Sequence, residues 1–230
     1  MITKKAFLST IPVMTGYIVL GIGFGIVLNT KGYGVLWSLL MSVGIYAGSM
    51  QFVTIDLLGA GASLFTVALT TFMVNCRHLF YGISMIDKYK NTGRIKPYLI
   101  FALTDETYSL VCTDSINMNE SERKRYYLLV SLFDHCYWIT GCVLGSLLGM
   151  IIPFDVTGID FSLTALFLTV LVEQWLSSDD HVPALIGLLA SLISLLVFGK
   201  DNFLIPSMII ITILLSLRKK ISKSKEVAKS

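Results

Sequence analysis

One stretch of the sequence, Asn75-Cys76-Arg77-His78-Leu79-Phe80-Tyr81, places a permanent positive charge inside a segment that is otherwise apolar. Arg77 is the only charged residue in the range 62–85. It lies nine residues before Ile86, where the apolar run ends, which is ~13 Å along a helix. A guanidinium at the centre of a bilayer costs roughly 2.5 to 3.5 kcal/mol on insertion scales. We therefore expect Arg77 to face a partner, a wet cavity or a substrate, with snorkelling towards the headgroups as the alternative.

The composition is that of a membrane protein and excludes a soluble domain of this size. Of the 230 residues, 54% are hydrophobic and 14% are charged, and the mean hydropathy is +0.74. The apolar runs are continuous and about 20 residues long, which is the length that a helix needs to cross a bilayer. The sequence therefore predicts an all-α fold, a polytopic transmembrane helical bundle.

Apolar segments follow one another along the whole chain, and we expect six to eight of them to cross the membrane. They cover residues 11–29, 35–58, 62–86, 98–116, 126–152, 162–177, 182–199 and 202–217. We interpret residues 1–217 as a single transmembrane domain whose first helix is retained and is not a cleaved signal peptide. Residues 218–230 form a basic tail, which the positive-inside tendency places in the cytoplasm.

The second apolar segment is interrupted by small and polar residues, among them Gly44, Gly48 and Gln51. A helix can break at such residues where it lines a cavity. If all segments crossed, the basic loop at residues 88–96 would lie outside the cell, against the positive-inside tendency. We therefore expect a broken or re-entrant segment near residues 44–56.

Glycines mark one helix face in each half of the chain. Gly141, Gly145 and Gly149 recur every four residues, which suits close packing against another helix. We expect that face to receive either a separate partner protein or another helix of this chain. Gly21 and Gly25 occupy a corresponding place in the first half, which suggests an internal repeat of four segments, as in many secondary transporters. Similar composition of two apolar halves is the alternative explanation.

Two carboxylates are placed to compensate the charge of Arg77. Asp105 and Glu106 lie eight and nine residues into the segment that begins after Pro97. If this segment and that of Arg77 enter the bilayer from the loop between them, their depths match, and Arg77 can pair with Asp105 or Glu106. The carboxylate left over can bind a substrate amine or a proton. A purely structural ion pair between two helices is the alternative.

Other ionisable residues at membrane depth are candidates for proton coupling. Asp134 and His135 can form a relay, although a packing histidine is an equal alternative. Glu173 is a further candidate. The cluster Asp179-Asp180-His181 is interpreted as a solvated turn, with a metal site as the weaker alternative. The four cysteines show no CxxC spacing and are interpreted as packing residues, so the sequence predicts neither a metal nor a cofactor.

Three motifs, in this order and spacing, resemble those of one family: Gly48-Ser49-Met50-Gln51-Phe52, the stretch at residues 75–81 and Thr104-Asp105-Glu106-Thr107-Tyr108. The family is the AzlC family, the large subunit of bacterial branched-chain amino acid permeases. The resemblance covers nearly the whole chain, but after Asp134 it depends mainly on length and hydropathy. It implies export of leucine, isoleucine, valine or their analogues together with a small AzlD-type membrane subunit. The substrate-binding candidates that it carries over are Gln51, Asn75, Arg77, His78, Asp105 and Glu106.

The chemistry of such a substrate agrees with these residues. An aliphatic zwitterion needs a cation or helix N-terminus for its carboxylate, an acceptor for its ammonium group and an apolar pocket. The sequence has no Walker A loop, so we expect a proton gradient to drive transport. It also has no HExxH motif and only three histidines, which disfavours an enzyme. A non-transporting scaffold or channel subunit is the alternative function, and the bacterial inner membrane is the expected location.

Overall fold

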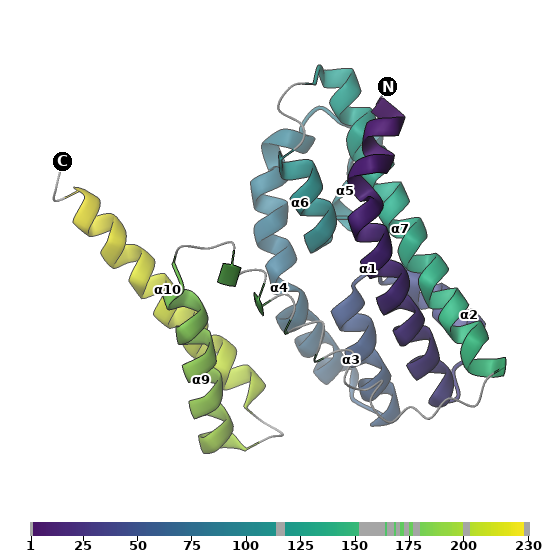
Figure 1. Cartoon of the computed structure of the whole chain (residues 1–230). Coiled ribbons are helices and arrows are strands. Elements are labelled where there is room, and N and C mark those ends of the chain that lie inside the picture. The colour runs from purple at the N-terminus through teal and green to yellow at the C-terminus, as the bar shows by residue number, and fades with distance from the viewer. Residues whose placement is uncertain are drawn as a thin grey trace. The chain divides into compact units, whose positions relative to one another are not determined.

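The computed structural model describes residues 2–113, 118–151, 180–199 and 203–227, together with residues 164, 168, 171, 172, 175 and 176. Every regular element in this part of the chain is a helix, which confirms the all-α prediction. The chain divides into two compact units, Met1–Leu163 and Thr164–Ser230. The larger unit contains the helices α1 to α7, and the smaller one contains α9 and α10 (Figure 1).

Three long helices frame the first unit: α1 (Ile2–Thr30), α4 (Leu64–Tyr89) and α7 (Glu120–Ile151). Within the described part of the chain, α1 and α7 are the helices that are long and apolar enough to cross a membrane. Helix α4 has 26 residues, or ~39 Å of rise, but it carries the polar stretch around Arg77 in its middle. The predicted number of six to eight crossings is not decided by these helices and stays a prediction.

Helices α1 and α7 run in the same direction and touch along a line of glycines. A Cβ atom on Gly21 would lie 2.8 Å from the backbone nitrogen of Cys142, and one on Gly25 would overlap the carbonyl oxygen of Cys142. From the other side, a Cβ atom on Gly145 would overlap the carbonyl oxygen of Ile22. Close glycine packing is thus confirmed. The expectation that this face receives a separate partner is wrong, because α1 of the same chain already fills it.

The second predicted segment is broken where its small residues occur. Helix α2 (Val35–Gly44) ends before the bend, and α3 (Gly48–Gly59) begins after it. Tyr46 lies in the bend with φ of +42°, in the left-handed region that non-glycine residues rarely adopt. Its ring is buried and stacks on His135 with the ring centroids 4.1 Å apart, which compensates for the unfavourable backbone. The predicted interruption near residues 44–56 is therefore present.

The structure contains a second break that the sequence reading did not predict. Residues 98–116 were expected to form one segment, but the chain instead passes through a 3₁₀ turn (Gly93–Ile95), α5 (Lys96–Phe101) and α6 (Asp105–Thr113). Thr104 is the cause, because its hydroxyl oxygen accepts the backbone N–H of Thr107 at 3.2 Å and so starts a new helix. The acidic residues that follow suit the positive end of α6.

The two broken pairs enter the first unit from opposite ends and meet in its middle (Figure 1). The α2–α3 pair connects the end of α1 to the start of α4, whereas the α5–α6 pair connects the end of α4 to the start of α7. At that latter end, Lys88 donates a hydrogen bond to the carbonyl of Cys112 at 2.7 Å. In the middle, the rings of Tyr46 and Phe101 lie 6.2 Å apart across the two bends.

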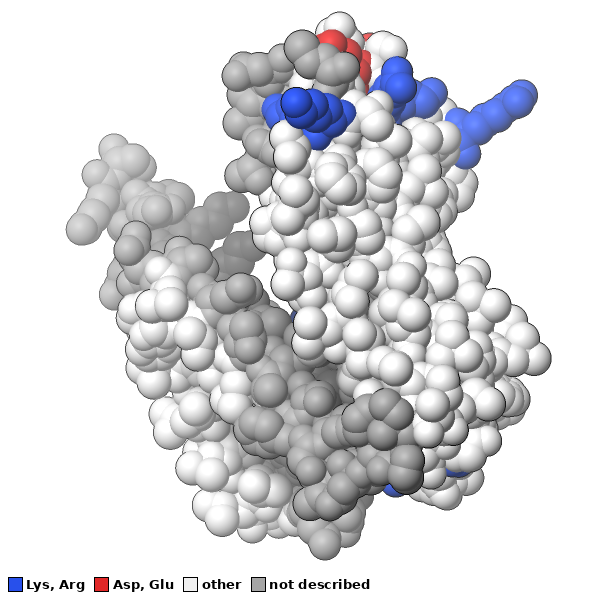
Figure 2. Space-filling model, turned by 45° about the vertical axis from the view of Figure 1, so that its right-hand side comes forward, with Lys and Arg blue, Asp and Glu red and all other residues white. Residues whose placement is uncertain are grey.

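Positive charge gathers at the end of the unit that holds the N-terminus. Lys88, Arg123 and Lys124 line one polar depression there, together with Asp87 and Glu120, and Nη2 of Arg125 lies 3.4 Å from Oγ1 of Thr3. Figure 2 shows Lys and Arg side chains gathered at one end, with a few Asp or Glu side chains beside them, above a wide surface with almost no charged groups. A basic end beside an uncharged belt is what the positive-inside tendency predicts for the cytoplasmic side of a membrane protein.

The second unit contains α9 (Val182–Phe198) and α10 (Leu204–Val227), which pack against each other. Arg218 of α10 pairs with Asp180, just before α9, at 2.5 Å. This hydrogen bond lowers the pKa of the Asp180 carboxyl, and the other carboxylate oxygen accepts the backbone N–H of Val182 at 3.2 Å. Asp180 therefore lies in an exposed turn, as expected, while Asp179 and Glu173 lie outside the described residues. Residues 218–227 of the predicted tail continue α10.

The glycine contact makes a direct prediction about stability. Gly25→Val should disrupt the α1–α7 contact and lower the free energy of unfolding by about 1 to 3 kcal/mol, the usual cost of overpacking. Gly16→Ala is the matched control, because no atom lies within 4 Å of a Cβ there and the same helix carries it. Thermal unfolding of the full chain in detergent measures both. Equal stability of the two variants would contradict the packing.

Candidate functional site

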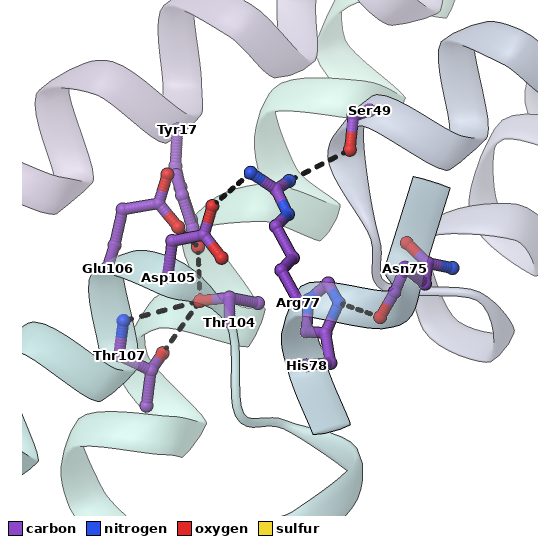
Figure 3. Close-up of polar contacts among 9 residues, drawn as sticks. All are labelled: Tyr17, Ser49, Asn75, Arg77, His78, Thr104, Asp105, Glu106 and Thr107. Atoms are coloured by element: carbon purple, nitrogen blue, oxygen red, sulfur yellow. Dashed lines mark hydrogen bonds and ion pairs between the residues drawn. The ribbon is translucent and has the colours of Figure 1, made fainter. Parts of the chain in front are cut away.

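Arg77 joins the starts of the two half-helices that follow the breaks. Its Nη1 lies 2.5 Å from Oδ2 of Asp105, the first residue of α6, and its Nη2 donates to Oγ of Ser49 at the start of α3 at 3.0 Å (Figure 3). The predicted pairing of Arg77 with a carboxylate of the next segment is confirmed, and Asp105 is that carboxylate. The pair is partly open, since the two side chains are 32% and 24% exposed.

Electrostatics explains why this arrangement can form. A helix N-terminus carries a partial positive charge, so a guanidinium beside two of them is unfavourable unless an anion is added. Asp105 supplies that anion in the first turn of α6, whereas the first turn of α3 contains no acidic residue. The start of α3 therefore keeps its partial positive charge next to Arg77.

Glu106 does not take part in the ion pair and has a neutral partner instead. Its Oε2 accepts a hydrogen bond from the hydroxyl of Tyr17 in α1 at 2.7 Å. The same hydroxyl lies 2.7 Å from Oγ1 of Thr104 in the second break (Figure 3). Thus the two neighbouring carboxylates of α6 differ: one faces a permanent charge and the other faces hydroxyl groups.

Asp134 and His135 point to different neighbours and share no hydrogen bond in the described contacts. Asp134 is fully buried, and its Oδ2 accepts from the hydroxyl of Thr107 at 2.8 Å. His135 bonds the carbonyl oxygen of Ser42 through Nε2 at 3.2 Å and the hydroxyl of Tyr98 through Nδ1 at 3.2 Å. His135 thus ties the last turn of α2 to α5, on either side of the site.

Gln51 is fixed by a single buried contact. Its Oε1 accepts from Nε1 of Trp138 at 2.7 Å, while its Nε2 has no partner in the described part of the chain. The Trp138 ring also lies against the start of α3, because a Cβ on Gly48 would come 3.0 Å from it. Gln51 is fully buried, so a free amide donor is held beside the positive end of α3.

The remaining candidates are less closely connected. Asn75 and His78 lie on α4 beside Arg77, and His78 bonds the backbone oxygen of Asn75 at 3.2 Å through Nδ1 (Figure 3). The Oδ1 of Asn75 is buried without a partner in the described chain. The structure therefore brings Gln51, Arg77, Asp105 and Glu106 to the two breaks, with Asn75 and His78 at the edge. Glu173 lies outside the described residues.

Several residues of the site could not be recognised by their charge. Tyr17, Ser49, Thr104, Thr107 and Trp138 are neutral, and the sequence reading gave them no role of their own. Thr104 left a signal, because a threonine that is followed directly by acidic residues is typical of a helix start. Trp138 lies one helical turn after Asp134 and so shares its face of α7.

Comparison with known proteins places these residues in a defined context. The family model described as AzlC protein matches residues 12–152. The chain is 40% identical to the branched-chain amino acid transport protein AzlC of Bacillus subtilis over 96% of its length and 87% of that protein. An uncharacterized membrane protein of Haemophilus influenzae is also 40% identical, over 94% of this chain and 88% of its own length.

A more distant relative is the inner membrane protein YgaZ of Escherichia coli. It is 29% identical over 79% of this chain and 77% of its own length. No solved structure matches the chain. The matched family region contains α7 and both breaks, and thus every residue placed at the site above.

The ion pair predicts energetic coupling between Arg77 and Asp105. Arg77→Met and Asp105→Asn should each destabilise the chain, because each leaves one charge without its partner. The double variant should lose less than the sum of the two, by about 1 to 3 kcal/mol, the range for residues in one ion-pair network. Thermal unfolding of the four chains in detergent gives this coupling energy, and strictly additive losses would argue against the pair.

Proposed function

We propose that this chain, which belongs to the AzlC family, is the large subunit of a membrane transporter for branched-chain amino acids. The relative in Bacillus subtilis is named a branched-chain amino acid transport protein. The relatives in Haemophilus influenzae and Escherichia coli are named as membrane proteins. The proposed substrates are leucine, isoleucine, valine and their analogues.

The observation that carries the proposal is the surplus of carboxyl groups over cations at the two breaks. Among the described residues there, three carboxyl groups, those of Asp105, Glu106 and Asp134, stand against one guanidinium, that of Arg77, which pairs with Asp105 alone. One carboxylate is neutralised by Arg77, and the others are bonded to hydroxyl groups. A surplus negative charge at membrane depth is unfavourable alone, but it is stabilised by the ammonium group of an amino acid.

Groups on the other side of the break can hold the substrate carboxylate. The first backbone hydrogen bond of α3 runs from the N–H of Gln51 to the carbonyl of Ala47, so the three N–H groups before Gln51 point out of the helix end. The free amide of Gln51 and the guanidinium of Arg77 lie beside them. A carboxylate at a half-helix N-terminus is a known solution in transporters with broken helices.

We further propose that transport is export and is coupled to protons. Asp134 is the first candidate for the proton carrier because it is buried and bonded only to a hydroxyl. His135 and Glu173 are the other candidates, and His135 is already engaged by Ser42 and Tyr98. A proton gradient exists across the inner membrane of a bacterium. This membrane is the proposed location of the protein, with its C-terminus in the cytoplasm.

A small AzlD-type membrane protein is the proposed partner subunit. Its contact surface must lie outside the glycine face of α7, which α1 covers. The rival function, a scaffold or channel subunit that does not itself carry substrate, would leave the ion pair as a purely structural link. Transport measurements separate the two functions.

Proteoliposomes or cells that contain the full chain, with and without its small partner, should move labelled leucine. Arg77→Ala and Asp105→Asn should each lower the initial rate at least about tenfold while the protein still inserts into the membrane, because each change leaves an uncompensated charge at the site. Lys90→Ala, an exposed change at the end of the same helix, is the control. Wild-type rates in both site variants would disprove the assigned site, and no leucine movement in any preparation would favour the scaffold.

A further inference from the structure

Five side chains from three helices and one break form a continuous row inside the first unit. Glu106 lies 2.7 Å from the hydroxyl of Tyr17, which lies 2.7 Å from Oγ1 of Thr104. Thr104 lies 3.1 Å from the hydroxyl of Thr107, which lies 2.8 Å from Oδ2 of Asp134. Each separation is within hydrogen-bond range. Two carboxyl groups are thus joined by three hydroxyl groups.

Counting hydrogens shows that this row is incomplete when both carboxyls are ionised. Four oxygen–oxygen contacts need four hydrogens, but the hydroxyls of Tyr17, Thr104 and Thr107 supply only one each. If Tyr17 donates to Glu106 and Thr107 donates to Asp134, one contact in between has no hydrogen. The two oxygens of that contact then repel each other, because they are buried within hydrogen-bond distance and no hydrogen lies between them. One additional proton, on either carboxyl, removes the conflict.

The additional proton has two equivalent positions. When Glu106 carries it, Glu106 donates to Tyr17, Tyr17 to Thr104, Thr104 to Thr107 and Thr107 to Asp134. When Asp134 carries it, every hydrogen bond runs in the opposite direction. To pass from one state to the other, each hydroxyl accepts one proton from one neighbour and gives one to the next, so no hydroxyl gains or loses charge.

We propose that Glu106 and Asp134 hold one proton between them and pass it through Tyr17, Thr104 and Thr107, and that this is the proton exchanged during transport. The inference rests on the proposed transport function and deepens it. The row then carries one net negative charge, which can lie at either end. Loading and release of a substrate ammonium group at one end are thereby linked to the position of the proton.

The surroundings agree with a single shared proton. Arg77, the guanidinium nearest to the row, is already paired with Asp105 and bonded to Ser49. His135, the residue after Asp134, is turned to Ser42 and Tyr98, and the ring of Tyr46 stacks on it. Among the described residues, therefore, these neighbours supply no unpaired cation to neutralise a second negative charge.

A second observation marks the Asp134 end of the row. Asp134 is fully buried, and its Oδ1 has no hydrogen-bond partner in the described part of the chain. A bare oxygen of an ionised carboxylate is costly in that position. When the shared proton is on Oδ2, the carboxyl is neutral and Oδ1 is an uncharged carbonyl oxygen, which lowers this cost, and a substrate ammonium group near Oδ1 would lower it too.

The test is to break the row without touching either carboxyl. Thr107→Val replaces a buried hydroxyl by a methyl group of the same shape, and Thr107→Ser keeps the hydroxyl. Proteoliposomes with the full chain and its small partner are loaded with leucine and a pH-sensitive dye, and leucine and proton fluxes are recorded together. Leucine–leucine exchange without a pH gradient is measured as well.

We expect Thr107→Val to lower proton-driven leucine flux at least about tenfold, and by a larger factor than it lowers leucine–leucine exchange, and Thr107→Ser to restore the coupled flux, because only the hydroxyl can pass a proton. Thr10→Val is the control, since Thr10 is also buried and is bonded to a tyrosine hydroxyl, that of Tyr137, outside the row. If Thr107→Val fails to fold, Tyr17→Phe interrupts the same row from α1.

Each outcome of these measurements either supports the shared proton or contradicts it. Undiminished proton-driven flux in Thr107→Val or Tyr17→Phe would overturn the inference, and so would equal losses in the valine and serine variants, which would indicate a packing role. Leucine transport without any proton movement in the wild type would overturn the inference and leave the substrate assignment intact. Only the absence of leucine movement altogether would overturn the two together.

Discussion

A charged or polar group at membrane depth must be compensated by other groups of the same chain, because lipid offers none. In this protein the constraint acts on one guanidinium and on two interrupted helices. Arg77 is stabilised by Asp105 and Ser49, and these two residues stand at the starts of the helices that the interruptions create. The ion pair and the breaks therefore depend on each other.

The compensation divides the carboxyl groups of the site into two kinds. Asp105 faces a guanidinium that cannot lose its proton, so its carboxylate serves to balance that charge. Glu106 and Asp134 face hydroxyl groups, which stabilise either form of a carboxyl. The adjacent residues Asp105 and Glu106 thus have different partners, a guanidinium and a tyrosine hydroxyl, because adjacent residues on a helix point about 100° apart.

The sequence predicted the features that follow from the cost of burying a charged or polar group in lipid. A lone arginine in an apolar run requires a carboxylate at equal depth, and Asp105 is that residue. Small residues in the second segment indicated its interruption, which lies between Gly44 and Gly48. The same reasoning could not tell Asp105 from Glu106 as the partner of Arg77, since both lie at nearly the same depth and only their orientation differs.

Features that depend on neutral residues were missed for a physical reason. A threonine hydroxyl starts α6, and apolar length alone made that region resemble one continuous helix. Tyr17 reaches the site from a position 89 residues before Glu106, and no pattern within α1 indicates where its hydroxyl ends. The glycine face of α7 was recognised as a packing surface, but periodicity cannot say whether the opposing helix is in the same chain.

The opposite entry of the two broken pairs has a mechanical meaning. The glycine contacts leave no room for α1 to shift against α7, so these two helices form a rigid support for both broken pairs. The α5–α6 pair covers the middle of the unit from the basic end, and the α2–α3 pair covers it from the other end. Arg77 holds one residue of each pair. Arg77 is therefore a tie between the two pairs, and either pair could move away from the other only if one of these two contacts broke.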